Sequence, residues 1–399
     1  MTEEEFERLT KDAALQFLKL HGNEDARELA FRYNDRKDIP VRAISEQISC
    51  RKKGSKKLPS LTRAEILFDK IALEQSSGEV TAKFKQTLIS GNSLIDLTGG
   101  LGADDIFLSK GFDKVIYCEQ NPALFKLFNY NKALLGIKNI DTIPGDSIEI
   151  LSGFPEKHFD WIYADPARRF EGRKAVGLQN CSPDIVKHLG LLKTKGHKIL
   201  IKASPALEFE EANSQLPGLE KFIVVSVDGE CKEILLTVNT EEPPPLPAIM
   251  AAVLDSSGGS TIITAGKSES DIRISEAPQK YFYEPDPAII KARLTPQIAE
   301  QYQADLLRRG LDYLTSDKEI PDFPGRKFIT IAALPYKKKI ISEYLTVNKI
   351  KKANLSRRDF PDSPEKIKKL YRLEDGGSEY IFFTKNLSAE LIAIFCRKA

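Results

Sequence analysis

Between residues 92 and 240 the chain alternates short apolar runs with helical patterns, and this rhythm constrains the fold more than any other feature. The runs SLIDLT, KVIYCE, IDTIPGD, FDWIYADP and HKILIKA each have the length of one buried strand, with room for a helix between them. Such alternation predicts an open, mostly parallel sheet. Only DGECK separates the last two runs, FIVVSV and EILLTV, which is too short for a crossover helix and predicts an antiparallel hairpin. The predicted fold class is α/β and Rossmann-like, ending in a reversed strand.

The first of these runs breaks into a glycine-rich loop within LIDLTGGLGADD, residues 94 to 105. Glycines permit a tight turn whose backbone can approach a ligand closely, so a nucleotide-type cofactor is the first hypothesis. The dinucleotide fingerprint G-x-G-x-x-G requires a third glycine three residues after Gly102, where this chain has Asp105. Nicotinamide and flavin cofactors are therefore less favoured.

The length of 399 residues exceeds the size at which one core usually keeps growing, so several domains are expected. Residues 1–90 show helical spacing, interrupted by the basic segment from Arg51 to Lys57, which predicts a flexible exposed loop. The segment EEPPPLP at 241–247 is a stiff connector, residues 248–265 predict two strands, and residues 286–314 predict helix. The predicted domains are a helical domain at 1–90, the α/β core at 91–240, a small α+β domain at 248–325 and a basic domain at 326–399.

Charge is distributed unevenly along the chain. Residues 326–399 contain 17 Lys and Arg against 8 Asp and Glu, a net charge of +9, so residues 1–325 carry −7 of the total of +2. A basic module of this kind either meets a phosphate backbone or presents a solvated face. The five cysteines are far apart without a C-x-x-C pair, so neither a disulfide framework nor a zinc site is expected. The acidic N-terminus and the lack of a long apolar run favour a cytoplasmic protein with no membrane span.

The order of the glycine loop, YCEQN, PGD, YADPARR and a terminal strand hairpin resembles the class I S-adenosylmethionine-dependent methyltransferases, over about residues 70 to 240. The resemblance implies a seven-stranded core that holds S-adenosylmethionine. The acid before the turn would pair with the methionyl ammonium, an acid after the second strand would accept the ribose hydroxyls, and an acid after the third would receive the adenine amine. The implied cofactor residues are Asp96, Thr98, Gly100, Gly102, Glu119 and Asp146, with Thr81 (and Lys85 beside it) near the cofactor carboxylate.

The segment Asp165-Pro166-Ala167-Arg168 carries the substrate hypothesis. In methyltransferases that act on exocyclic amines of bases, this strand end reads Asp, Asn or Ser, then Pro, Pro and an aromatic; the carboxylate accepts hydrogen bonds from the amine. Asp165 and Pro166 match as catalytic residues, whereas Ala167 and Arg168 depart, so Phe170 or Tyr163 is the candidate stacking aromatic. The segment also resembles the Asp-Pro-Pro-Arg of uridine C5 methyltransferases, but Ala203 stands where their cysteine nucleophile belongs, and a lone Cys181 is more often incidental. Amine methylation is preferred.

The stretch from about residue 327 resembles THUMP-like domains, which bind RNA, and YFYEPDPAIIKA with its following helix resembles the small ferredoxin-like domain that can precede them. The interleaved aromatics Tyr336, Tyr344 and Phe360 agree with RNA binding. The leading function is therefore methylation of a base amine in tRNA or rRNA. A protein methyltransferase and a catalytically silent RNA-binding protein that retains a cofactor site are the alternatives, no metal is expected, and the oligomeric state stays open. The residues expected to contact RNA are Arg168, Arg169, Phe170, Lys337, Lys338, Lys339, Lys351, Lys352, Arg357 and Arg358.

Overall fold

The computed structural model describes residues 1–168, 177–242, 244–266 and 272–399, with the side chains of Arg168 and Asn180 left out. The chain divides into two compact units. The first comprises Met1–Phe222 and Glu233–Pro247, and the second comprises Ile223–Lys232 and Ala248–Ala399. The domain boundaries expected from the sequence are finer than this division and stay predictions.

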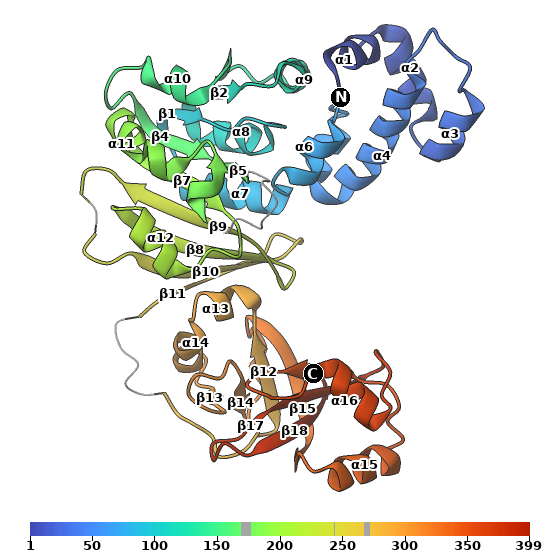
Figure 1. The fold of residues 1–399 in the computed structure, drawn as a ribbon, viewed down its shortest axis with the longest axis vertical. Helices are drawn as coiled ribbons and strands as arrows, with labels where there is room; N and C mark the ends of the chain where they lie inside the picture. Colours follow the sequence, from blue (N-terminus) through green and yellow to red (C-terminus); the bar gives the residue numbers. More distant parts are fainter. Residues whose placement is uncertain (169–176, 243, 267–271) are drawn as a thin grey trace. The chain divides into compact units, whose positions relative to one another are not determined.

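The first unit begins with helices (Figure 1). They are α1 (Glu3–Leu9), α2 (Asp12–His21), α3 (Ala26–Arg32), α4 (Val41–Lys57), α5 (Pro59–Arg63), α6 (Lys70–Gln75) and α7 (Glu79–Leu88). A capping box starts α1, in which the Thr2 hydroxyl accepts from the Glu5 amide and the Glu5 carboxylate accepts from the Thr2 amide.

The predicted loop from Arg51 to Lys57 is wrong, because this segment is the last part of helix α4. Gly54 lies at a close contact of that helix: a Cβ built on it would stand 2.6 Å from the Thr62 hydroxyl and 3.1 Å from the Phe68 ring. The glycine that suggested flexibility is therefore explained by tight packing against α5 and the segment after it.

Most of the core of the first unit is one twisted sheet of parallel strands that ends in a reversed strand, although residues 223–232 of its last hairpin belong to the second unit. The strands are β1 (Gly91–Asp96), β2 (Phe112–Glu119), β3 (Ile140–Pro144), β4 (Phe159–Ala164), β7 (Gly196–Ala203), β8 (Leu219–Val227) and β9 (Glu230–Asn239). Their order is β3-β2-β1-β4-β7-β9-β8, and it continues through β8 to β10 (Ala248–Leu254) and β11 (Ser260–Thr264). The pairs β1–β2, β1–β4, β2–β3 and β4–β7 are parallel, whereas β7–β9 is antiparallel. The predicted sheet is confirmed.

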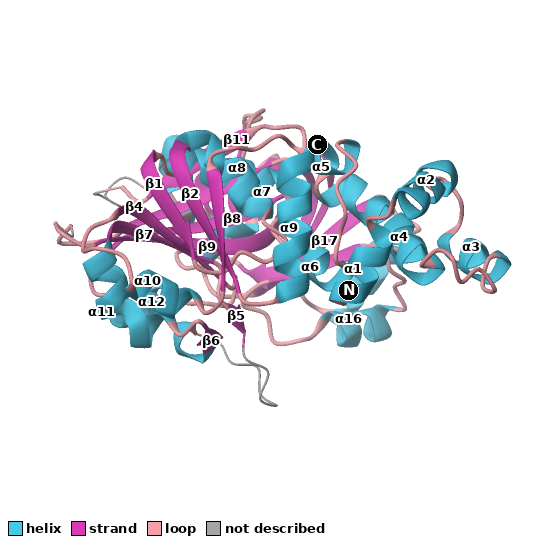
Figure 2. Ribbon diagram, turned by 90° about the horizontal axis from the view of Figure 1, so that it is seen from above, coloured by secondary structure: helices cyan, strands magenta, loops and turns pink. Residues whose placement is uncertain are grey.

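Helices cover this sheet on both faces (Figure 2), as the alternating sequence requires. They are α8 (Ala103–Leu108), α9 (Pro122–Leu134), α10 (Ser147–Ser152), α11 (Ile185–Lys195) and α12 (Phe209–Gln215). A two-stranded sheet, β5 (Ala167–Arg168) with β6 (Cys181–Ser182), lies after β4. The turn between β8 and β9 is Asp228-Gly229, both with positive φ (50° and 77°), which is the geometry of a tight two-residue hairpin.

The second unit contains a seven-stranded sheet in the order β13-β14-β12-β15-β18-β17-β16. Its strands are β12 (Tyr281–Pro285), β13 (Asp305–Leu306), β14 (Leu314–Ser316), β15 (Gly325–Pro335), β16 (Asn354–Arg357), β17 (Glu379–Lys385) and β18 (Leu391–Lys398). Its helices are α13 (Pro287–Lys291), α14 (Thr295–Gln301), α15 (Lys338–Val347) and α16 (Pro364–Tyr371). Strands before and after residue 325, the expected boundary between the last two domains, thus belong to one sheet.

The helical prediction for residues 286–314 is wrong after Gln301. The chain adopts positive φ at Arg293 and Gln303, each just after a short helix, and then forms β13 and β14. The apolar residues Leu307, Leu311 and Tyr313 pack into a cluster with Phe282 and Phe328 from neighbouring strands. Tertiary packing therefore overrides their helix-like spacing.

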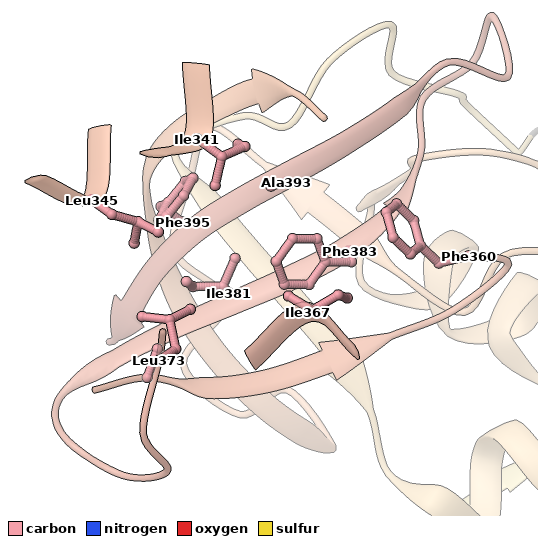
Figure 3. Close-up of a cluster of buried hydrophobic side chains, with 10 residues drawn as sticks. Ile341, Leu345, Phe360, Ile367, Leu373, Ile381, Phe383, Ala393 and Phe395 are labelled. Carbon is pink, nitrogen blue, oxygen red and sulfur yellow. The ribbon is translucent and has the colours of Figure 1, made fainter. Parts of the chain in front are cut away.

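The other face of the same sheet is covered by α15 and α16. Ile341 and Leu345 of α15 and Ile367 of α16 pack on side chains of β17 and β18, including Phe383 and Phe395 (Figure 3). Two apolar clusters on opposite faces make this sheet the core of the second unit.

In the described part of the chain, no helix has both the length and the apolar character that crossing a membrane requires.

Candidate functional site

The glycine loop follows β1 and is packed tightly on one side and open on the other. A Cβ on Gly99 would stand 2.4 Å from the Tyr117 ring, and one on Gly102 would stand 2.1 Å from the Phe128 ring. These two rings stack with centroids 3.9 Å apart, and the Tyr117 hydroxyl donates to the Gly100 carbonyl at 2.7 Å. Gly100 has φ +59°, and its missing Cβ would point at nothing closer than 3.5 Å. The loop is thus packed against the Tyr117 and Phe128 rings on one side, whereas a side chain at Gly100 would make no contact closer than 3.5 Å.

Asp96 and Thr98 are joined by hydrogen bonds at the end of β1. Asp96 is 2% exposed, and its Oδ1 accepts from both the amide and the hydroxyl of Thr98 at 2.8 Å. Burial raises the pKa of Asp96 to about 7, although hydrogen bonds from Asp105 and Thr98 oppose that rise.

Asp105, in the first turn of α8, is completely buried beside Asp96. Burial first and then the Asp96 charge raise the pKa of Asp105 well above its ordinary value. Neither of its carboxyl oxygens meets an N–H or O–H donor among the described residues. Ionisation of both buried carboxyls at once is therefore disfavoured, as expected for paired acids in a low-dielectric site.

Glu119 and Asp146 follow β2 and β3 and line the same edge of the sheet. Glu119 Oε2 accepts from the Gly100 amide at 2.8 Å and its Oε1 accepts from the Asn121 amide at 2.7 Å. Asp146 caps α10, with Oδ1 accepting from the amides of Ile148 and Glu149. The structure therefore brings the acids after β1, β2 and β3 together at the carboxyl edge, the place where ligands bind in open α/β sheets.

Asp165 follows β4 at that same edge and is held at two points. Its amide donates to the Thr98 hydroxyl at 2.7 Å, so Thr98 connects it to Asp96. Its Oδ2 is paired with the ammonium of Lys202 from β7. Pro166, the next residue, is buried, and it is followed directly by β5.

A buried ionic cluster lies beneath the site, and the sequence did not indicate it. Lys85 of α7 has a fully buried side chain, with Nζ 2.7 Å from Glu233 Oε1 and 3.2 Å from Asp104 Oδ1. Asp104 also accepts from Ser77 at 2.8 Å and from the Tyr163 hydroxyl at 2.7 Å. Burial acts to raise the pKa of Asp104. The charges of Lys85 and then of Lys202 act to lower it, and the net shift of that pKa is downward.

These contacts locate the residues that the sequence placed near the cofactor carboxylate. Lys85 is paired with the buried acids. Thr81 is 4% exposed, and its hydroxyl donates at 3.2 Å to the carbonyl of Gly78, the residue that caps α7. Thr81 as a cofactor residue stays a prediction.

The suggestion that Tyr163 serves as the stacking aromatic is wrong. Tyr163 is 1% exposed in the middle of the sheet, with its hydroxyl bonded to Asp104, so its ring has no free face. Arg169 and Phe170 lie outside the described residues, as does the side chain of Arg168. Cys181 is buried and pairs with Arg168 in the β5–β6 sheet.

The basic residues of the second unit fall into two groups. Lys352 pairs with Glu374 at 2.9 Å, Arg358 with Glu284 at 3.2 Å, and the Arg357 guanidinium donates to the Phe360 carbonyl at 2.7 Å. In contrast, Lys337, Lys338, Lys339 and Lys351 are exposed, and their side chains make no ion pair within the described residues.

The aromatics expected among these lysines pack inward. Phe360 is 5% exposed within the cluster of Figure 3, Tyr344 packs on Phe395 with centroids 4.4 Å apart, and Tyr336 lies against Phe360 and donates to Asp362 at 3.0 Å. The expectation that Phe360 interleaves with the basic residues as an RNA-stacking aromatic is wrong, because it belongs to the core.

Comparison with known proteins agrees with this architecture. A family model described as "THUMP domain-like" matches residues 325–398. A crystal structure described as "putative methyltransferase from Porphyromonas gingivalis W83" superposes with a TM-score of 0.83, 28% sequence identity and 100% coverage of both chains. No curated protein matches the sequence. The protein therefore has the fold of a methyltransferase, and its residues 325–398 match a THUMP-like domain, as the sequence predicted.

Two further solved structures resemble the core more weakly. TrmK of M. capricolum in complex with S-adenosyl-homocysteine is 15% identical over 42% of this chain and 70% of its own, with a TM-score of 0.33. An O-methyltransferase from Bacillus cereus in complex with SAH is 12% identical over 48% of this chain and 97% of its own, with a TM-score of 0.35. At these scores neither bears on the function of this protein.

Proposed function

We propose that the protein uses S-adenosylmethionine to methylate an exocyclic amine of a base in RNA, either tRNA or rRNA. The observation that carries the proposal is the convergence of Asp96, Glu119, Asp146 and Asp165 at one edge of the sheet. Thr98 joins Asp96 to Asp165, and the glycine loop is bonded to Glu119. The methyltransferase fold and the THUMP-like domain support the reaction class and an RNA substrate respectively.

The residues at this edge fit S-adenosylmethionine. Gly100 leaves open space beside a backbone with positive φ, and the buried carboxyls of Asp96 and Asp105 suit a cationic ligand. Glu119 keeps lone pairs beyond its two amide bonds for ribose hydroxyls, and Asp146 Oδ2 is not used by the helix cap. When bound, the cofactor supplies an electrophilic methyl group on sulfur.

The protein's part in the reaction is to orient the acceptor. Asp165 would accept a hydrogen bond from the substrate amine, aiming the nitrogen lone pair at the methyl carbon without a covalent enzyme intermediate. A base amine is neutral at physiological pH, so no strong base is needed to expose its lone pair. The free lysines 337, 338, 339 and 351 would contact RNA phosphates, which fits the net charge of +9 in residues 326–399.

Cofactor binding is tested first, by calorimetry on the full-length protein. We expect micromolar-range binding of S-adenosylmethionine that is lost in Glu119→Ala and kept in Glu149→Ala, an exposed acid on α10 that serves as the matched control. No binding by the unmodified protein refutes the cofactor assignment.

Methyl transfer is tested next, with tritiated cofactor and RNA from a strain that lacks the protein. We expect label that ribonuclease removes and protease does not, and loss of transfer in Asp165→Ala. Label sensitive to protease instead favours a protein substrate. RNA binding without transfer favours the catalytically silent alternative, which the departures at Ala167 and Arg168 motivate.

A further inference from the structure

The ion pair between Lys202 and Asp165 lies where two parallel strands of the core end. Lys202 is the last but one residue of β7, and Asp165 follows β4, its neighbour in the sheet. Their side chains are 14% and 33% exposed, so Lys202 is largely buried, whereas the Asp165 carboxylate reaches the surface of the site.

The position of Asp165 is fixed from both sides. Its amide is bonded to Thr98 in the glycine loop, and its Oδ2 is bonded to the Lys202 ammonium. Among the described residues, no donor reaches the other oxygen, Oδ1. One carboxylate oxygen is therefore held by the protein, and one is left for an incoming hydrogen-bond donor.

Lys202 stays charged in this environment. Burial acts to lower its pKa, but Asp165, Glu233 and Asp104 surround it and raise that pKa above the ordinary value for a lysine. It is therefore a permanent ammonium beside the carboxylate and cannot serve as a base near neutral pH.

We propose that Lys202 is a positioning residue of methyl transfer, which fixes Asp165 by Oδ2 so that Oδ1 orients a neutral base amine. This inference rests on the proposed function. The amine lone pair forms the N–CH₃ bond while the methyl–sulfur bond breaks and leaves its electrons on sulfur; one amine proton then passes to water.

The protonation state of the acceptor distinguishes two substrate classes. A protein lysine is protonated at neutral pH, with an ordinary pKa of about 10.4, and must lose a proton before it can react; Lys202, itself protonated, cannot accept that proton. A base amine is already neutral and needs no such step, so it fits this ion pair as the acceptor.

The test uses full-length Lys202→Met and Lys202→Arg, with Lys198→Met as the control. Lys198 lies on the same strand, is 39% exposed, and pairs only loosely with Glu220 at 3.6 Å. With tritiated cofactor and RNA from the strain lacking the protein, we expect Lys202→Met to lower kcat about a hundredfold while KM changes less than threefold, since a misplaced orienting group costs about that much. The arginine variant should keep more activity than the methionine variant, and the control should match the unmodified protein.

Two binding measurements separate positioning from a structural defect. Affinity for S-adenosylhomocysteine, measured by calorimetry, should change less than threefold in Lys202→Met. A double-mutant cycle with Asp165→Asn, followed in urea by the fluorescence of Trp161, should show that the double variant loses less stability than the sum of the two single variants.

The outcomes are distinguishable. If the unmodified protein methylates RNA and Lys202→Met is equally active, or if the cycle shows no coupling, the inference is overturned and the proposed function stands. If S-adenosylhomocysteine affinity falls as far as kcat, Lys202 supports the cofactor and is not a positioning residue. If the unmodified protein methylates the protein fraction and not RNA, both proposals fail.

Discussion

Lys85 gives the sharpest test of how charge is arranged beneath the site. Its ammonium is fully buried, 2.7 Å from Glu233 and 3.2 Å from Asp104. At an effective dielectric constant of about 20, these separations correspond to attractions of about 6 and 5 kcal/mol. Desolvation of the three charges offsets much of this, and removing one partner of a buried cluster typically costs about 3–5 kcal/mol because it leaves the others unpaired. We expect Lys85→Met to lower the free energy of unfolding by that amount at pH 8.

The loss should depend on pH in a definite direction. In the native protein the pKa of Asp104 lies below its ordinary value, so its contribution to stability is present above the unfolded pKa and disappears as pH falls through the folded one. Without Lys85, the largest of the causes that lower the pKa of Asp104 is gone, so we expect burial to raise that pKa. Protonation then relieves the unpaired charge in the folded state, and the deficit of the variant should shrink between pH 8 and pH 5.5.

Urea unfolding followed by Trp161 fluorescence measures this effect, because Trp161 is the only tryptophan in the sequence and is buried in β4 of the first unit. The control is Lys83→Met on the same helix; Lys83 is 57% exposed and pairs with Glu79 at 2.7 Å, so we expect a loss of less than about 1 kcal/mol. The double variant Lys85→Met/Glu233→Gln should recover part of the stability. A loss below about 1 kcal/mol at pH 8, or one that is as large at pH 5.5, would refute the reasoning.

Three further predictions concern the loop, the cofactor and the lysines. Because the pKa of Asp96 is raised to about 7 and a cationic ligand favours its ionised form, affinity for S-adenosylmethionine should rise by up to about fivefold from pH 6 to pH 7, by up to about tenfold from pH 6 to pH 8, and level off above pH 8; calorimetry showing the same affinity throughout would contradict this. Gly102→Ala should destabilise the first unit by at least about 2 kcal/mol in urea unfolding, since its Cβ would meet Phe128 at 2.1 Å and its φ is +73°, whereas alanine at Gly190, where a Cβ meets nothing within 4 Å, should cost little. Replacing Lys337, Lys338 and Lys339 with Gln should make the slope of log K against log salt for RNA binding shallower by up to about 2. The same change at Lys366 and Lys368, which are paired with Asp362 and Asp375, should alter that slope less. Equal slopes for both variants would show that the unpaired lysines are not the RNA contacts.

Much of the first unit could be predicted from the sequence because its strands are buried on both faces. Runs such as KVIYCE and HKILIKA are continuous and apolar, and parallel order fixes which strand ends meet. Asp96, Glu119 and Asp165 each stand directly at such an end, so their convergence followed from position alone. The hairpin turn at Asp228-Gly229 carried an equally local signal.

The buried ionic cluster could not be predicted in this way. Lys85 and Glu233 are 148 residues apart in the chain, and nothing near either one indicates a partner. Lys202 lies near the end of a strand beside Asp165, but a lysine in such a position is usually solvated, so the sequence does not indicate its ion pair. In the second unit, local spacing also misled: Phe360 lies among basic residues yet packs into the core, because its surroundings in space come from β17 and β18 and not from its neighbours in sequence.

Thr98 shows why the glycine loop and the substrate side of the site should act together. Its hydroxyl donates to Asp96 Oδ1 and accepts from the Asp165 amide, so its single proton and one of its lone pairs connect the two acids. Asp96 lies on the side expected to meet the cofactor, and Asp165 lies on the side expected to meet the base. A ligand that moved Asp96 would displace Asp165 through the Thr98 hydroxyl. The Lys202 ammonium, on the neighbouring strand β7, resists that movement. The reactive geometry therefore depends on two fixed points around Asp165, one from β7 and one from the loop after β1.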